Sequence, residues 1–526
     1  MSHLRPLGLA ALVASSLAAC MGMASKRASP LAYAPPPSAG AMDGESLGVE
    51  EYEHRADNPL LAVAQAPLST FSIDVDTASM ANVRRFLEQG ELPPADAVRV
   101  EEMINYYRYD YPEPKGDQPL AVSAEVAPSP FHADRLLARI GIKGKTLGTE
   151  ALPPRNLVFL VDTSGSMSAE NKLPLVQQSL ATLADQLGPR DTVSMVAYAG
   201  SAGVMLPPTS GEERGAIKNA LYGLSSGGST NGEGGIKLAY QLAQAHFDPE
   251  GINRVILCTD GDFNVGVSDQ GSLVRLVEEK RKSGVYLTVL GFGMGNLKDS
   301  TMEKLAQHGN GNYGYIDSID EAKKSLVEEA AGTLVTLAQD VKIQVEFNPA
   351  TVAQYRLVGY ENRLLRDQDF RDDTKDAGEL GVGQTVTALY ELVPAAGADA
   401  TAGALEYQTG RTLTDASDSG ALFTVHVRFK RPGNDKGEEL AQRVLPGAAR
   451  MADASADFRF AAALAGFGMM LRNSEHKGGL TWKATHELAA TSAGGSPRRR
   501  ALVDLIARAA KLSGGDQAVT PIATTP

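Results

Sequence analysis

The stretch Phe159-Leu-Val-Asp-Thr-Ser-Gly-Ser-Met167 decides how this chain folds. An apolar run at 157–161 ends abruptly at Asp162, and the hydroxyl groups of Ser164 and Ser166 follow at alternate positions. An apolar run that ends in turn residues is typical of a strand buried on both faces. One carboxylate and two hydroxyls are oxygen ligands that suit a hard divalent cation such as Mg²⁺. The stretch therefore predicts a buried strand that ends in part of a metal site.

Apolar strands and helix-length segments alternate on both sides of this stretch, from 156 to about 337. The expected strands are 156–162, 192–199, 203–207, 253–259, 285–291 and 312–316. The expected helices are 170–187, 212–223, 234–247, 269–283, 298–308 and 319–337. This alternation predicts an α/β fold of the Rossmann-like kind, with a central, mostly parallel sheet flanked by helices.

Two further oxygen-bearing segments are expected beside the first. A glycine-rich loop at 227–235 contains Thr230, and a second buried strand at 255–259 is followed by Asp260. Parallel strands have their carboxyl ends at one edge of the sheet, where ligands of open α/β sheets bind. The sequence therefore predicts one cation site, whose ligands are listed here in chain order: Asp162, Ser164, Ser166, Thr230 and Asp260.

These motifs resemble the metal-ion-dependent adhesion site of von Willebrand factor type A domains, over about 155–337. The resemblance implies that Ser164, Ser166 and Thr230 bind the metal directly. It also implies that Asp162 and Asp260 hold its water molecules, and that a Glu or Asp of a protein partner takes the open position. Mg²⁺ is the expected ion, with Mn²⁺ or Ca²⁺ as alternatives. Few directly bound carboxylates leave positive charge on the metal, which favours an incoming carboxylate.

The segments that flank the α/β region have a different period. Apolar residues alternate with polar ones at 136–143, 341–347 and 423–430, which predicts half-buried antiparallel strands. We expect the α/β domain (151–338) to be inserted into a β-sandwich that an N-terminal segment (67–150) shares with a β-rich domain (339–435). Two independent β-domains are the alternative. The charged stretch 361–379 predicts an exposed loop.

Helices are expected after the β-rich domain, in a C-terminal helical region at 436–513. The expected helices are 438–449, 454–472, 481–490 and 497–512. We expect the residues that follow, 514–526, to form a disordered tail.

The N-terminus has the pattern of a targeting segment. Arg5 precedes an apolar core at 7–17, and Leu17-Ala-Ala-Cys20 follows and resembles the lipobox of bacterial lipoproteins. The resemblance implies that residues 1–20 are a lipoprotein signal peptide and that Cys20 carries the lipid. By resemblance to the lipoproteins of double-membrane bacteria, Met rather than Asp at residue 21 implies a location at the outer membrane, facing the periplasm. An ordinary secretory signal is the alternative.

Residues 21–66 are rich in Ala, Ser, Pro and Gly and predict a flexible tether between the lipid and the folded body. The only other cysteine is Cys258, so no intramolecular disulfide is expected once Cys20 is acylated. The formal net charge of −13 argues against nucleic acid as the partner, because binding it needs basic patches.

The whole chain resembles a narrower group, the YfbK-like bacterial lipoproteins, over most of 60–510. The sequence segments that carry this resemblance are Ser69-Thr-Phe-Ser-Ile-Asp-Val-Asp-Thr-Ala-Ser79, Asn82-Val-Arg-Arg-Phe86 and Thr259-Asp-Gly-Asp-Phe-Asn-Val-Gly266. The resemblance implies an architecture and no particular partner. The first of these segments contains Asp74, Asp76 and Ser79, which could mimic a second cation site. The chemistry of a turn at the end of a strand explains these residues more simply.

Three functions are compatible with the predicted site. The leading hypothesis is a lipid-anchored envelope protein that binds a carboxylate of a protein partner through the metal. A structural envelope scaffold with a stabilising metal is the alternative. A metal-dependent hydrolase is less favoured, because no His lies near the cluster in sequence and Ser164 is not in a Gly-x-Ser-x-Gly motif. We therefore expect a binding protein rather than an enzyme.

Overall fold

The computed structural model describes residues 50–261, 270–295, 297–395 and 413–514. The chain divides into two units, Met1–Leu47 and Gly48–Pro526, and all the described residues belong to the second. The predicted signal peptide, the lipidation site Cys20, most of the predicted tether and the tail from residue 515 lie outside the described residues. Within the described part of the chain, every helix is too short or too polar to cross a membrane.

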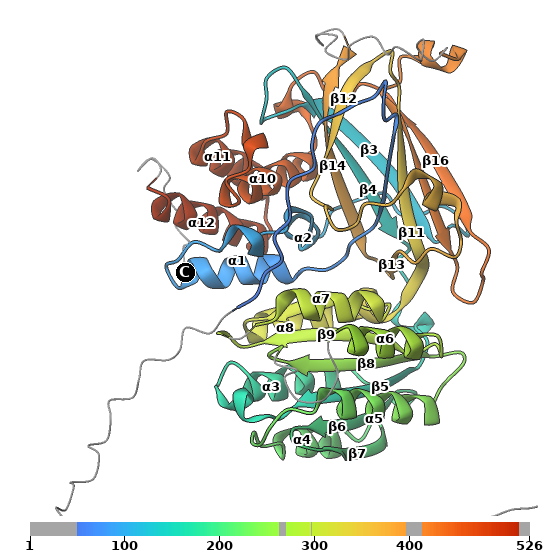
Figure 1. Ribbon diagram of the computed structural model, residues 1–526, viewed down its shortest axis with the longest axis vertical. Coiled ribbons are helices and arrows are strands. Elements are labelled where there is room, and N and C mark those ends of the chain that lie inside the picture. Colours follow the sequence, from blue (N-terminus) through green and yellow to red (C-terminus); the bar gives the residue numbers. More distant parts are fainter. Residues whose placement is uncertain (1–49, 262–269, 296, 396–412, 515–526) are drawn as a thin grey trace, which may run out of the picture. The chain divides into compact units, whose positions relative to one another are not determined.

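A six-stranded sheet in the order β10-β9-β8-β5-β6-β7 forms the centre of the α/β region (Figure 1). Neighbouring strands are parallel except β6 and β7, which are antiparallel. The strands are β5 (Arg155–Asp162), β6 (Thr192–Tyr198), β7 (Ala202–Ser210), β8 (Ile252–Thr259), β9 (Tyr286–Phe292) and β10 (Tyr313–Ile316). The predicted α/β fold class is confirmed.

The central strand β5 is buried on both faces. Phe159 and Val161 belong to one hydrophobic core, while Val158 and Leu160 belong to another on the opposite face. The first core includes side chains of α3 (Leu173–Ala184), α4 (Arg214–Tyr222), α8 (Ile319–Lys323) and α9 (Ala330–Leu334). The second includes side chains of α5 (Gly232–Ala245), α6 (Gln270–Arg281) and α7 (Asp299–His308), together with α1 (Ala78–Glu88) from the N-terminal segment. Helices therefore cover both faces of the sheet.

Strands from before and after the α/β region share two further sheets, which we call the β framework (Figure 1). One sheet has the order β1-β12-β14-β4-β3, and the other has β13-β11-β15-β16 with β2 also paired to β11. The early strands are β1 (Leu61–Ala62), β2 (Leu68–Ser72), β3 (Leu120–Pro128) and β4 (Leu136–Gly144). The late strands are β11 (Thr336–Phe347), β12 (Val352–Val358), β13 (Gly378–Gly381), β14 (Thr385–Pro394), β15 (Phe423–Lys430) and β16 (Glu438–Val444).

Two antiparallel pairings join the halves of this framework. In the first sheet, Ile140 of β4 lies opposite Ala388 of β14. In the second sheet, Phe71 of β2 lies opposite Ile343 of β11. Apolar side chains of both sheets form a single core. The chain therefore leaves the framework before residue 155, forms the α/β region, and returns to complete the same sheets.

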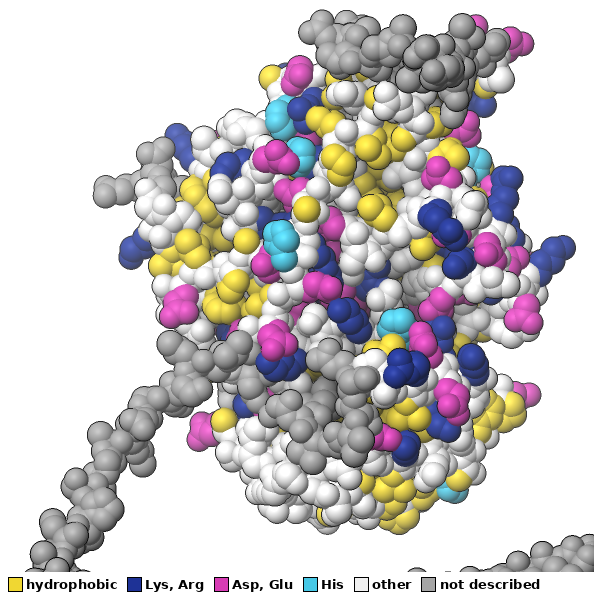
Figure 2. Space-filling view, in the orientation of Figure 1, with side chains coloured by type: hydrophobic (Ala, Val, Ile, Leu, Met, Phe, Trp, Pro, Cys, Tyr) yellow, Lys and Arg dark blue, Asp and Glu magenta, His cyan; other side chains and the backbone are white. Residues whose placement is uncertain are grey.

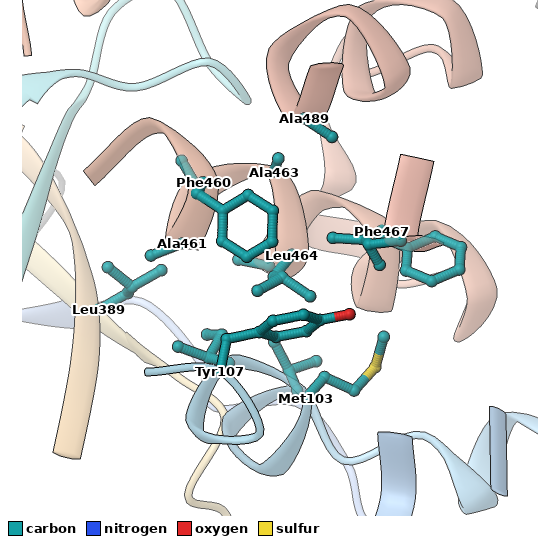
Figure 3. Packing of buried hydrophobic residues seen from close by; sticks show 14 of the residues in the cluster. Met103, Tyr107, Leu389, Phe460, Ala461, Ala463, Leu464, Phe467 and Ala489 are labelled. Atoms are coloured by element: carbon teal, nitrogen blue, oxygen red, sulfur yellow. The ribbon is translucent and has the colours of Figure 1, made fainter. Parts of the chain in front are cut away.

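A helical layer packs on the outer side of the first sheet. It consists of α1 (Ala78–Glu88), α2 (Val100–Asn105), α10 (Ala456–Leu471), α11 (Trp482–Ser492) and α12 (Pro497–Leu512). Figure 3 shows Tyr107 facing Leu464 and Phe460 of α10, while Met103 extends toward Phe467 of the same helix. Leu389 of β14 belongs to the same core. The rings of Tyr107 and Phe460 meet edge to face, with centroids 5.0 Å apart. Early and late segments of the chain thus share this core as well.

The prediction of a flexible tether is wrong for residues 50–66. Residues 50–58, which we call the N-terminal strap, are held by ion pairs, and Val63 is buried in the framework core. Glu50 forms an ion pair with Arg85, and Arg55 forms one with Glu303 of α7. The Ala/Ser/Pro/Gly-rich composition ends before this charged stretch, so composition averaged over 21–66 concealed it. Figure 2 shows acidic and basic side chains gathered in the middle of this face, between the framework and the α/β sheet.

Two predicted helices are also wrong. Residues 438–444 form strand β16, which pairs with β15. Along it, half-buried residues such as Glu438 and Leu440 alternate with exposed ones such as Glu439. The single helix expected at 319–337 is instead α8, a π-helical segment (Lys324–Glu328) and α9 (Ala330–Leu334), followed directly by β11. The buried Lys324 ammonium pairs there with Glu329, at 2.9 Å, within this irregular segment.

Candidate metal centre

The two predicted carboxylate ligands lie at one edge of the α/β sheet. Asp162 is the last residue of β5, and Asp260 directly follows β8, the parallel neighbour of β5. Both side chains have no exposed surface. Buried carboxylates on neighbouring strand ends need a positive charge or hydrogen-bond donors nearby.

Both carboxylate oxygens of Asp162 accept hydrogen bonds. The backbone N–H of Ser164 donates to Oδ1 at 2.9 Å, and the Thr259 hydroxyl donates to Oδ2 at 3.0 Å. The Tyr198 hydroxyl donates to the same Oδ2 at 3.2 Å. Burial raises the pKa of Asp162 to about 6, although the hydrogen bonds from Ser164 and Thr259 act in the opposite direction. These bonds fix the carboxylate at the strand end.

The hydroxyl ligands lie on two loops that are in backbone contact. The Oγ atoms of Ser164 and Ser166 are 3.0 Å apart. The N–H of Gly165 donates to the carbonyl of Gly228 at 3.0 Å, within the glycine-rich segment that precedes Thr230. A Cβ atom at Gly165 would lie 3.4 Å from that carbonyl oxygen, which is an ordinary van der Waals contact. Thr230 itself is 6% exposed. The structure therefore brings the serine loop and the threonine loop together at the edge that carries Asp162.

The sequence-based reasoning missed one charged residue at this edge, Lys172. Its Nζ donates to Asp260 Oδ2 at 2.9 Å, and the residue is 7% exposed. The lysine is 88 residues from its partner in sequence, so no local motif reveals the pair.

The donor set fits a hard divalent cation. It consists of carboxylate and hydroxyl oxygens alone, with no sulfur or imidazole among the five predicted ligands, and such oxygens are the ligands of Mg²⁺ and Ca²⁺. A divalent cation there would compensate the two buried carboxylates that the single ammonium of Lys172 only partly neutralises.

A second acidic group, formed by Asp74, Asp76 and Glu102, does not have the character of a metal site. Its carboxylate oxygens lie within 4.8 Å of one another, and all three residues are buried. Arg363 donates to Asp74 and to Asp76, each at 3.1 Å, and Arg99 donates to Glu102. Two guanidinium groups already supply the positive charge, so these carboxylates are structural. Arg363 lies in the predicted exposed loop 361–379, and that prediction is wrong at this residue.

Comparison with protein families divides the chain along the same lines as its fold. The model of the von Willebrand factor type A domain matches residues 156–329, and one described as von Willebrand factor matches 46–139. A third model, the C-terminal region of YfbK, matches residues 332–512. The α/β region is therefore a von Willebrand factor type A domain. Domains of this class commonly bind a divalent metal and mediate protein–protein interactions.

Similarity over most of the chain identifies the family more narrowly. The chain is 43% identical to the Escherichia coli K12 protein named "Uncharacterized protein YfbK" over 459 residues. The aligned residues cover 86% of this chain and 79% of that protein. The chain belongs to the YfbK family. The resemblance predicted from the sequence is thereby confirmed.

More distant relatives share only part of the chain. Human inter-alpha-trypsin inhibitor heavy chain H4 is 32% identical over 166 residues, which cover 30% of this chain and 18% of that protein. Among solved structures, a von Willebrand factor type A protein from Catenulispora acidiphila matches with a TM-score of 0.43 at 15% identity, covering 71% of this chain and 87% of that one. The ArnB paralog VWA2 from Sulfolobus acidocaldarius matches with a TM-score of 0.36 at 15% identity, covering 75% and 98%.

Proposed function

We propose that this protein is a lipid-anchored protein of the bacterial envelope that binds an acidic side chain of a protein partner through a divalent cation. The cation, Mg²⁺ in the first instance, would be held by Ser164, Ser166 and Thr230, with Asp162 and Asp260 holding its water molecules. The observation that carries the proposal is the meeting of the serine and glycine-rich loops beside Asp162 at the carboxyl edge of the sheet.

Binding is favoured over catalysis by the chemistry around the two carboxylates. The partners that the described residues give to Asp162 and Asp260 are hydroxyls, a backbone amide and an ammonium group. No imidazole is among these described partners, and a hydrolase would need a general base within hydrogen-bond reach of its substrate. A bound cation would supply an open coordination position with residual positive charge, which suits a carboxylate.

Anchoring through Cys20 and a location at the outer membrane, facing the periplasm, are part of the same proposal. They are supported by the order of Arg5, the apolar core and Leu17-Ala-Ala-Cys20 in the sequence. With a tether between the lipid and the body, the metal edge could reach a partner in the same membrane or across the periplasm. Labelling of the expressed chain with a fatty acid, lost in Cys20→Ser, tests the anchor.

Affinity capture tests the binding function. The full chain is immobilised and exposed to a solubilised envelope fraction in Mg²⁺ or in EDTA. A partner retained in Mg²⁺ should be released by EDTA and should not bind Ser166→Ala. Ser168→Ala is the matched control, because Ser168 lies in the same turn but is exposed and is not a predicted ligand. Capture that persists in EDTA and in Ser166→Ala would contradict the proposal and favour the alternative of a structural scaffold.

A further inference from the structure

Lys172 places its side-chain ammonium group at the metal edge. Its ammonium group donates to the buried Asp260 at 2.9 Å, while 7% of the residue is exposed. The backbone of Lys172 is held as well, because its N–H donates to Ala169 and its carbonyl accepts from Val176 at the start of α3. The ammonium therefore belongs to the built structure of the site.

The loop after β9 leaves space for this lysine. Gly293 has a backbone φ of +78°, a value that residues with a side chain rarely adopt. A Cβ atom at this position would lie 2.4 Å from Cγ and Cε of Lys172. Any larger residue at 293 would displace the lysine stem. Two independent features, the ion pair and the close approach of Gly293, thus set the position of one ammonium group.

A fixed ammonium beside the site affects the cation and the acidic ligand in opposite ways. It repels a divalent cation and already neutralises part of the charge on Asp260 that the cation would otherwise neutralise. Once a cation is bound, the same ammonium adds one positive charge to the loaded site and attracts an incoming carboxylate.

We infer that Lys172 is a positioning residue that makes the cation and the acidic ligand bind together: it weakens binding of the bare cation and strengthens binding of a carboxylate to the loaded site. The inference rests on the proposed function, since it concerns the regulation of the same site. Because coupling between two ligands is reciprocal, a carboxylate should raise the affinity for the cation more when Lys172 is present than when it is absent.

This inference can be tested without any protein partner. The full chain is titrated with Mg²⁺, and isothermal titration calorimetry measures the affinity. Lys172→Met should bind Mg²⁺ about tenfold more tightly than the wild type, as expected from removing one charge near a divalent cation. Acetate, used as a small carboxylate, should increase the Mg²⁺ affinity of the wild type more than that of Lys172→Met. Lys218→Met is the matched control, since Lys218 pairs with the half-exposed Asp185 on the surface of the same domain. This control should titrate like the wild type.

Equal or weaker Mg²⁺ binding by Lys172→Met would overturn the inference. Gly293→Ala provides a second variant if Lys172→Met fails to fold, since the added methyl group should push the ammonium away from Asp260 and likewise tighten Mg²⁺ binding. Partner capture that ignores EDTA would refute the proposed function alone, because the titration still decides the role of Lys172. A wild-type chain that binds no Mg²⁺ would overturn both.

Discussion

Replacing Glu101 with Gln should change how the stability of this protein depends on pH. Glu101 lies in α2 with no exposed surface, and neither of its carboxyl oxygens has a hydrogen-bond partner among the described residues. Burial raises its pKa from 4.5 to about 8, and the carboxylates of Glu361 and Asp74 add to the increase. The folded protein therefore holds a proton on Glu101 at pH values where the unfolded chain has lost it.

The sign of the effect follows from this difference. Between the unfolded and the folded pKa the folded state binds more protons, so its stability is greatest near the lower value and falls as the pH rises. The loss approaches about 1.4 kcal/mol per pH unit, or about 3–4 kcal/mol between about pH 5 and about pH 8. Gln cannot ionise, so Glu101→Gln should remove this decline. Its uncharged amide is also buried and costs about 1–3 kcal/mol at every pH.

The free energy of unfolding is measured from urea denaturation at about pH 5 and about pH 8, with circular dichroism as the signal. Relative to the wild type, Glu101→Gln should gain about 3–4 kcal/mol on going from the acidic to the alkaline condition. Glu88→Gln is the matched control, because Glu88 is exposed at the end of α1, and its profile should match that of the wild type. Parallel profiles for Glu101→Gln and the wild type would refute the reasoning.

Three further outcomes are expected. Thr230→Ala removes a hydroxyl ligand and should weaken Mg²⁺ binding at least about tenfold in calorimetry, while unfolding in EDTA stays unchanged. Phe460→Ala removes a fully buried ring that meets Tyr107 and should lower the free energy of unfolding by about 3–5 kcal/mol in urea. Arg472→Met breaks the pair with Asp57 and should release the N-terminal strap, seen as faster limited proteolysis of residues 50–58 without loss of the rest.

The α/β region could be predicted from the sequence because its strands are buried on both faces and its helices carry one apolar stripe. Each element there is specified by its own residues, as the run 157–161 illustrates. Strand β16 could not be predicted in this way. Its residues Glu438-Glu-Leu-Ala-Gln-Arg-Val444 favour a helix by intrinsic propensity, and only pairing with β15 makes them a strand.

The candidate site divides in a similar way. Asp162, Ser164 and Ser166 lie within five consecutive residues, so their motif was visible in the sequence. Lys172 and Arg363 could not be predicted as parts of these acidic groups, because each pairs with a carboxylate far away in sequence. Arg363, for example, is 289 residues from Asp74. A sequence motif reveals the ligands of a site, whereas the charges that tune it depend on the assembled fold.

These distant pairs also explain why the von Willebrand factor type A domain is tied to its framework. Arg99 of the N-terminal segment pairs with Asp299 of α7, and Arg363 of the framework approaches Glu303 of the same helix at 4.0 Å. The strap adds Arg55, which pairs with Glu303 at 2.7 Å. Cutting the domain out at its two chain connections would remove these arginine partners of Asp299 and Glu303. The helix α7 is therefore held by residues from outside the domain, and experiments on the metal site need the full chain rather than the isolated domain.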